Sequence, residues 1–123
     1  MTSALGIRGA TTADSNTKEA IVSATEELLM AMVEANGIAE NDIAAVFFTT
    51  TGDLNAEFPA VAARVRMGWE RTALMNSQEM DVPDGTASVI RVMLLANTDK
   101  SKDDLVHVYL KGARTLRARG TAQ

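Results

Sequence analysis

The run SVIRVMLLA at residues 88–96 constrains the fold more than any other part of the chain. Its residues are apolar at both odd and even positions, which is typical of a β-strand buried on both faces. Arg91 stands in the middle of this run. An unpaired buried guanidinium is too costly to keep, so Arg91 must meet a carboxylate, either from the protein itself or from a ligand.

A second arginine, Arg8, lies in another strand-like run, ALGIRGA at residues 4–10. Its neighbours two positions away, Gly6 and Ala10, would share its face of the strand and are very small. Empty volume beside a cation favours an anion, so the pattern at Arg8 favours a ligand. Arg91 fits a structural ion pair equally well. Together the two arginines indicate a pocket for a small anion.

Three further side chains could belong to such a pocket. Glu79 follows a short predicted strand and is either a solvated loop carboxylate, a partner for the arginines, or an acceptor for a substrate hydroxyl. Tyr109 shares one face of the last predicted strand with His107, and a lone histidine is more often structural than catalytic. The basic residues near the C-terminus either solvate that end or close over a bound anion; they are Arg114, Arg117 and Arg119.

Charge and composition exclude several classes of protein. A net charge of −4 argues against nucleic-acid binding, which needs a basic face for phosphates. With no cysteine and one histidine, the chain has no disulfide framework, thiolate zinc site or cysteine nucleophile, and no loop spacing supports a serine triad. Its apolar runs are too short to span a membrane and it starts without a basic signal region, so we expect a soluble, cytoplasmic protein.

The periodicity predicts one α/β (or α+β) domain over residues 1–123, with a mixed β-sheet packed against helices. Asn16 with Glu19 has the spacing of a capping box, and Gly37 suits the end of the helix that follows. The C-terminal part, from about 115 to 123, is expected to be a flexible tail. The predicted strands are 3–10, 43–49, 72–76, 88–96 and 105–110, and the shorter predicted helices are 58–66 and 111–117.

Seven segments, in order and without large gaps, resemble the monofunctional chorismate mutases of the AroH class. They are GIRGATT (6–12), DLNAEFPA (53–60), GW (68–69), QEMDV (78–82), IRVM (90–93), HVYL (107–110) and LR (116–117). The resemblance implies a pseudo-α/β-barrel homotrimer with its active sites at subunit interfaces. It also implies the Claisen rearrangement of chorismate to prephenate, a step toward phenylalanine and tyrosine. That reaction is unimolecular and needs no proton transfer, covalent intermediate, metal or cofactor.

The resemblance further assigns a role to each site residue. Arg91 would contact the ether oxygen, which gains negative charge as its C–O bond breaks, as well as a carboxylate. Arg8 and Tyr109 would grip substrate carboxylates, and Glu79 would accept a hydrogen bond from the ring hydroxyl. The remaining substrate-binding residues would be Phe58, Ala60 and Arg64 from the neighbouring subunit, Met75, Asn76, and the C-terminal residues Leu116 and Arg117.

Three positions depart from the family's pattern. Asn76 stands where a cysteine often approaches the substrate hydroxyl, and Met75 replaces a small polar residue. Val61 replaces a lysine at the pocket rim, which would weaken capture of a dianionic substrate. Two other functions remain open: a trimeric module that binds a small carboxylate without converting it, and a different small-molecule enzyme on a similar scaffold, such as an imine/enamine deaminase.

Overall fold

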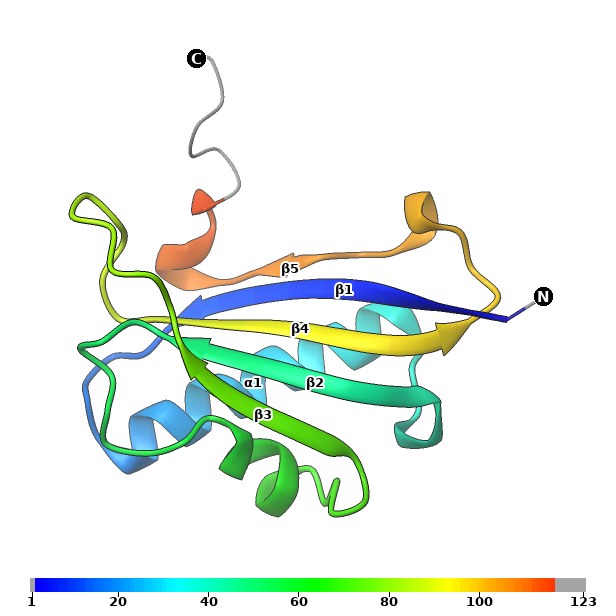
Figure 1. Cartoon of the computed structure of the whole chain (residues 1–123), viewed down its shortest axis with the longest axis horizontal. Helices are drawn as coiled ribbons and strands as arrows, with labels where there is room; N and C mark the ends of the chain where they lie inside the picture. Colours follow the sequence, from blue (N-terminus) through cyan, green and yellow to red (C-terminus); the bar gives the residue numbers. More distant parts are fainter. Residues whose placement is uncertain (1, 117–123) are drawn as a thin grey trace.

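The structure, a computed structural model, describes residues 2–116 and contains one mixed sheet in the strand order β3-β2-β4-β1-β5 (Figure 1). The central strand β4 runs antiparallel to both of its neighbours, β1 and β2. The edge strands β3 and β5 run parallel to β2 and β1, respectively. The predicted mixed sheet is therefore confirmed. The strands are β1 Ser3–Thr12, β2 Ile43–Thr50, β3 Ala73–Gln78, β4 Val89–Thr98 and β5 Val108–Tyr109.

Helix α1, Lys18–Asn36, covers one face of this sheet (Figure 1). Its buried apolar side chains pack against strand residues that point to the same side, and this contact forms the main core. At Gly9 the packing is so close that a β-carbon would lie 2.4 Å from the Met32 sulfur. Burial of these side chains is the main force holding the subunit together. Members of this core include Ile7, Leu28, Leu29, Met32, Val46, Phe48, Val92 and Leu94.

The ends of α1 agree with the sequence at one terminus and differ at the other. Gly37 adopts the left-handed conformation, φ 62°, and its N–H donates to the Val33 carbonyl, as predicted. The N-cap is Thr17, whose Oγ1 accepts from the Ala20 N–H at 3.1 Å, so the predicted cap at Asn16 is wrong. The Asn16 side chain instead accepts from two backbone N–H groups of the loop after β2, those of Asn55 and Ala56.

Short helical turns connect the remaining elements: η1 Glu40–Asp42, η2 Ala62–Arg66, η3 Lys102–Asp104 and η4 Lys111–Ala113. The predicted strand at 105–110 is reduced to β5, and the predicted helix at 111–117 is reduced within the described residues to the turn η4 and a few turn-like residues beyond it. Lys111 has a positive φ of 51°, which turns the chain sharply after β5. Arg117 and most of the expected flexible tail lie outside the described residues. No helix among residues 2–116 is long and apolar enough to cross a membrane.

The two faces of the sheet differ in how they are covered. Paired residues on the α1 side, such as Val46 with Leu94 and Phe48 with Val92, are fully or almost fully buried. The opposite face is uncovered over much of its area by the described residues, and we call it the open face. One row across it is Arg8, Met93, Phe47 and Met75, and the next is Tyr109, Ala10, Arg91, Thr49 and Ser77.

The prediction that residues 88–96 are buried on both faces is therefore wrong for a single subunit. Even-numbered residues of β4 point toward α1, whereas Arg91 and Met93 lie on the open face. The Arg91 side chain is 49% exposed, and Met93 is 46% exposed. The physical reason is that α1 packs on one side of the sheet, whereas none of residues 2–116 covers the centre of the other side.

Candidate active site

Arg91 on the open face forms an ion pair with Glu79, the residue that follows β3. The Arg91 Nη1 lies 2.9 Å from Glu79 Oε2, which also accepts from Thr49 Oγ1 at 3.3 Å. The other carboxylate oxygen, Oε1, accepts from the Met80 N–H at 3.1 Å. The prediction that Glu79 is a partner for an arginine is thus confirmed for Arg91. With half of its side chain exposed, Arg91 can still bind a further acceptor.

Arg8 lies one row away from Arg91 on the same face, because Arg8 pairs with Met93 and Ala10 pairs with Arg91. Its Nε is buried and has no hydrogen-bond partner among the described residues. A buried donor without a partner is unfavourable, and an incoming carboxylate would satisfy it. Tyr109 is held beside this position, since β5 pairs Tyr109 with Ala10. The open face therefore brings together all four predicted catalytic residues: Arg8, Glu79, Arg91 and Tyr109.

His107 has a structural contact. Its Nδ1 accepts from the backbone N–H of Arg8 at 2.9 Å, so this nitrogen carries no proton when the bond forms. The contact joins the segment before β5 to the middle of β1, and it helps to place Tyr109 next to Ala10. This agrees with the structural interpretation of a lone histidine.

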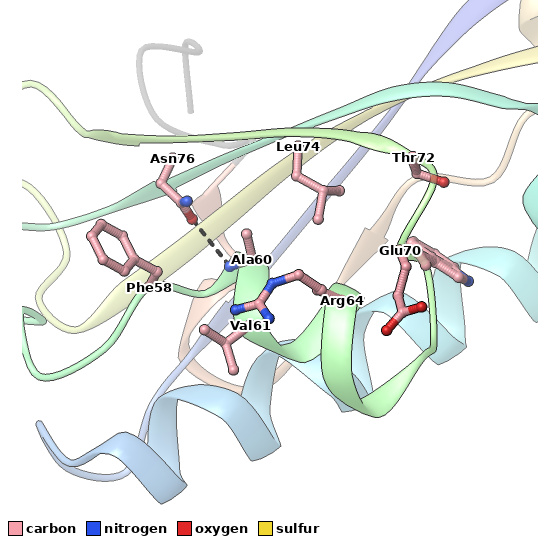
Figure 2. Close-up of a pocket in the computed structure, with 9 residues that line it drawn as sticks. Phe58, Ala60, Val61, Arg64, Glu70, Thr72, Leu74 and Asn76 are labelled. Carbon is pink, nitrogen blue, oxygen red and sulfur yellow. Dashed lines mark hydrogen bonds between the residues drawn. The ribbon is translucent and has the colours of Figure 1, made fainter.

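A pocket of about 390 Å³ lies on the α1 side of the sheet, at its β3 edge, between β3 and the helical segment that contains η2 (Figure 2). Asn76 joins the two walls, because its Oδ1 accepts from the Ala60 N–H at 3.0 Å, drawn as a dashed line in Figure 2. The pocket contains four of the predicted substrate-binding residues. Its lining consists of Phe58, Ala60, Val61, Arg64, Trp69, Glu70, Thr72, Leu74 and Asn76.

The irregular turn η2 holds Arg64 at this pocket. A π-helical turn adds one residue to the helical repeat, and here the Met67 N–H donates to the Ala62 carbonyl at 3.0 Å. Arg66 reaches α1, where it forms ion pairs with Glu26 at 3.0 Å and with Glu19 at 3.2 Å. The segment is thus tied to α1 through Arg66, while Arg64 remains free to line the pocket (Figure 2).

The two groups of predicted site residues lie on opposite faces of the sheet within one chain. Leu74 and Asn76 pair with the buried residues Val46 and Phe48 and line the pocket on that side. Met75 lies between them in sequence and therefore points to the open face, where it is 59% exposed. Leu116 is half-buried in the last described turn, and Arg117 lies outside the described residues.

Besides Val61, which was expected at the pocket rim, four pocket residues were not predicted as site residues: Trp69, Glu70, Thr72 and Leu74. Of these, Trp69 appeared in the sequence only as part of a GW pair at residues 68–69. Gly68 has a positive φ of 73°, and the Trp69 N–H donates to the Ala63 carbonyl at 2.9 Å, so the turn folds Trp69 back under the pocket. A glycine before a lone tryptophan was the available signal for this turn.

The fold and the open face define an α+β protein with two arginines on one face of its sheet, an arrangement suited to a small anion. Comparison with known proteins gives the particular family. The profile of chorismate mutase type I matches residues 4–119, so the chain belongs to this family.

Individual relatives agree with this assignment over most of the chain. Chorismate mutase AroH from Thermus thermophilus is 50% identical over 113 residues, which are 91% of this chain and 92% of the relative. Chorismate mutase AroH from Bacillus subtilis (strain 168) is 41% identical over 112 residues, 91% of this chain and 88% of the relative. The solved structure of a chorismate mutase from Clostridium thermocellum is 53% identical, with a TM-score of 0.88 over 90% of this chain and 98% of that one.

Proposed function

We propose that this chain converts chorismate to prephenate in the cytoplasm, as a step of aromatic amino-acid biosynthesis, and that it works as a homotrimer with active sites between subunits. Membership of the chorismate mutase family supports the reaction. The main support for a site shared between subunits is that its two groups of residues lie on opposite faces of the sheet within one chain. Arg8, Arg91 and Tyr109 are on the open face, whereas the pocket lies on the other side of the sheet.

The open face has the character of a subunit interface. Phe47, Met75 and Met93 form a continuous apolar row across three strands, and all three are exposed in the single chain. Large contiguous apolar surface on a soluble protein marks an interaction site. If the pocket edge of a second copy covers this face, the contact joins two different surfaces, and such head-to-tail contacts close into rings. A ring of three follows from the resemblance to the AroH class.

On the open face, each polar group has a task in the proposed reaction. The buried, unpartnered Nε of Arg8 and the Tyr109 hydroxyl bind carboxylates of the dianionic substrate and hold it in a compact conformation. Arg91 donates to the ether oxygen, whose negative charge appears as the C–O bond breaks. Since this interaction strengthens in the transition state, it lowers the barrier rather than merely tightening binding.

Glu79 has two tasks. Its ion pair with Arg91, at 2.9 Å, fixes the direction of the guanidinium, and its carboxylate accepts a hydrogen bond from the ring hydroxyl. The backbone N–H of Glu79 donates to the Thr50 carbonyl at 2.9 Å, so the residue is itself held at the end of β3. A cation that is already aimed needs no reorganisation when the charge develops.

The pocket supplies the second half of the proposed site. Phe58 and Ala60 provide an apolar wall, and Arg64 adds a peripheral positive charge. The Asn76 Oδ1 is occupied by the Ala60 N–H, which leaves the amide nitrogen of Asn76 as a donor for the substrate hydroxyl. Glu70 on the same rim and Val61 in place of a basic residue reduce the net attraction for a dianion, so we expect weaker capture of the substrate than with a lysine at position 61.

The function is tested by mixing the purified protein with chorismate and following the loss of the substrate's ultraviolet absorbance. Conversion to prephenate at micromolar protein is the expected result. Binding of chorismate without loss of absorbance would instead show a carboxylate-binding module. The mass of the particle in solution tests the assembly, and a monomeric active enzyme would contradict the shared site.

A further inference from the structure

The chain enters β4 through a backbone conformation that a serine rarely adopts. Ser88, directly before β4 and three residues before Arg91, has a φ of 58°. Glycine takes this left-handed conformation freely, but a side chain makes it unfavourable. Such a residue persists only where its surroundings hold it, and strained positions cluster near functional sites.

Asp53, in the loop after β2, provides the contacts that hold Ser88. The Asp53 Oδ2 accepts from the Ser88 N–H at 2.9 Å and lies 3.4 Å from the Ser88 hydroxyl. The Asp53 Oδ1 accepts from the Thr51 hydroxyl. Thr51 in turn binds Val89, with its Oγ1 accepting from the Val89 N–H and its own N–H donating to the Val89 carbonyl, both at 3.0 Å.

These bonds favour the ionised form of the carboxyl group. The hydrogen bond from the Thr51 hydroxyl has the largest effect and lowers the pKa of Asp53 below its usual range. Burial opposes it, and the smaller effects of backbone and side-chain donors, which include Ser88, lower the pKa further. Asp53 is therefore a carboxylate at neutral pH and accepts from every donor that faces it. The Ser88 carbonyl is also held, because it accepts from the Ala13 N–H at 3.0 Å.

The anchored junction controls the geometry of the Arg91–Glu79 pair. Glu79 begins the loop that leads to β4 and is fixed to Thr50, while Ser88 ends the same loop and is fixed to Asp53. Both ends of the loop are thus attached to one short stretch of chain, residues 50–53. A change at Ser88 would shift the start of β4 and move Arg91 relative to Glu79 and to the reacting oxygen.

We propose that Asp53 is a positioning residue for Arg91: it holds Ser88 in the left-handed conformation and so sets the start of β4. The consequence for catalysis rests on the proposed function. Asp53 itself lies outside both halves of the proposed site, so its effect passes through Ser88. This gives a specific expectation, because a glycine at position 88 would adopt the same conformation without an anchor.

The test is a set of four proteins: wild type, Asp53→Ala, Ser88→Gly and the double variant. Asp53→Ala should lower kcat with chorismate by about 10- to 10²-fold, the scale of a small misplacement of catalytic groups, with a smaller change in KM. Ser88→Gly should remain close to wild type. The double variant should recover most of the activity lost in Asp53→Ala. Asp103→Ala, which removes an exposed aspartate from η3, is the matched control and should change neither constant.

Two results would overturn the proposal. One is wild-type kcat in a folded Asp53→Ala variant, and the other is a double variant no more active than Asp53→Ala alone. Failure of the proposed function is distinguishable, since the wild-type protein would then leave chorismate unchanged. In that case the denaturation midpoints of the same four proteins test the anchor: Ser88→Gly must reduce the destabilisation caused by Asp53→Ala, and equal losses in both backgrounds would reject it.

Discussion

The two faces of the sheet are built from the same five strands but serve different purposes. On the covered face, Val46, Phe48 and Leu94 pack against α1 and are fully buried. On the open face, Phe47, Met75 and Met93 are exposed beside two arginines. One face thus stabilises the subunit, and the other presents charged groups and an apolar surface to whatever approaches it.

This difference implies that stability and chemistry can be changed separately. Because side chains alternate along a strand, neighbouring residues of β4 belong to different faces. Leu94 is fully buried, whereas Met93 and Arg91 are about half exposed. Substitutions one residue apart should therefore have effects of different kinds, which gives direct ways to test the comparison.

The largest effect on folding is expected for Leu94→Ala on the covered face. Removing a fully buried leucine side chain leaves a cavity and should lower the free energy of unfolding by about 2–5 kcal/mol. Met93→Ala on the open face should instead weaken association of subunits. Denaturant unfolding at several protein concentrations separates the two: the loss for Leu94→Ala should not vary with concentration, and that for Met93→Ala should. The same concentration dependence in both variants would contradict the claim that only the open face takes part in association.

The largest effect on catalysis without loss of fold is expected for Arg91→Ala. Removing one preorganised donor to a developing charge typically costs about 10²–10³-fold in kcat. Arg91→Lys should also be severely impaired, since one ammonium does not reproduce the guanidinium fork. Chorismate turnover and circular dichroism are the measurements. Arg66→Ala is the matched control, because Arg66 is also paired with carboxylates but on α1, and near-normal turnover in Arg91→Ala would remove its assigned role.

A smaller effect, confined to stability, is expected at the start of α1. Thr17→Ala removes the side-chain cap of the Ala20 N–H and should lower the free energy of unfolding by about 1 kcal/mol. The kcat per active site should not change, because the cap belongs to α1, which packs on the side of the sheet opposite to the open face. Asn16→Ala provides the comparison: it should leave the helix cap intact and loosen the loop at Asn55 and Ala56. A loss of cap stability in Asn16→Ala alone would contradict the assignment of Thr17.

The smallest effect concerns pH and Asp53. Since the folded protein lowers the pKa of this carboxyl group, its contribution to stability is present above the ordinary pKa and is lost as the pH falls through the depressed value. Asp53→Asn should therefore be less stable than wild type at neutral pH, and the difference should shrink in strong acid. Thermal unfolding of both proteins over an acidic pH series measures this, and a constant difference would show that ionisation of Asp53 does not matter.

The sequence predicted local structure well where local signals decide it. The strands at 43–49 and 88–96 and the long helix followed from apolar periodicity and from Gly37, and the structure has all three. The prediction of the helix cap was wrong because two adjacent residues both suit that position and a distant contact decides between them. Asn16 and Thr17 are both suitable caps, and the choice was decided by loop residues 55–56, which take up the Asn16 side chain.

The proposed trimer gives a physical explanation for the apolar pattern on both faces of residues 88–96, which the single chain does not explain. Even-numbered residues pack on α1, and the odd-numbered Met93 would pack against a second copy in the proposed trimer. In the proposed trimer the apolar pattern of this strand would reflect burial in the assembly, whereas the exposure of Arg91 in the single subunit depends on tertiary contacts. The pocket residues Trp69 and Glu70 come from a turn with no periodic signal, so periodicity did not indicate them. Thr72 was expected only as the first residue of a short strand.

The central claim is that the open face of one subunit and the pocket of another form one site, and complementation tests it most directly. Arg91→Ala disables the open face, and Arg64→Glu places a repelling charge in the pocket. Each variant alone should be nearly inactive with chorismate. When equal amounts of the two are refolded together, one site of each mixed trimer, or about one quarter of all sites, should combine two intact halves, and activity should rise accordingly. A mixture no more active than its separate components would contradict a site shared between subunits.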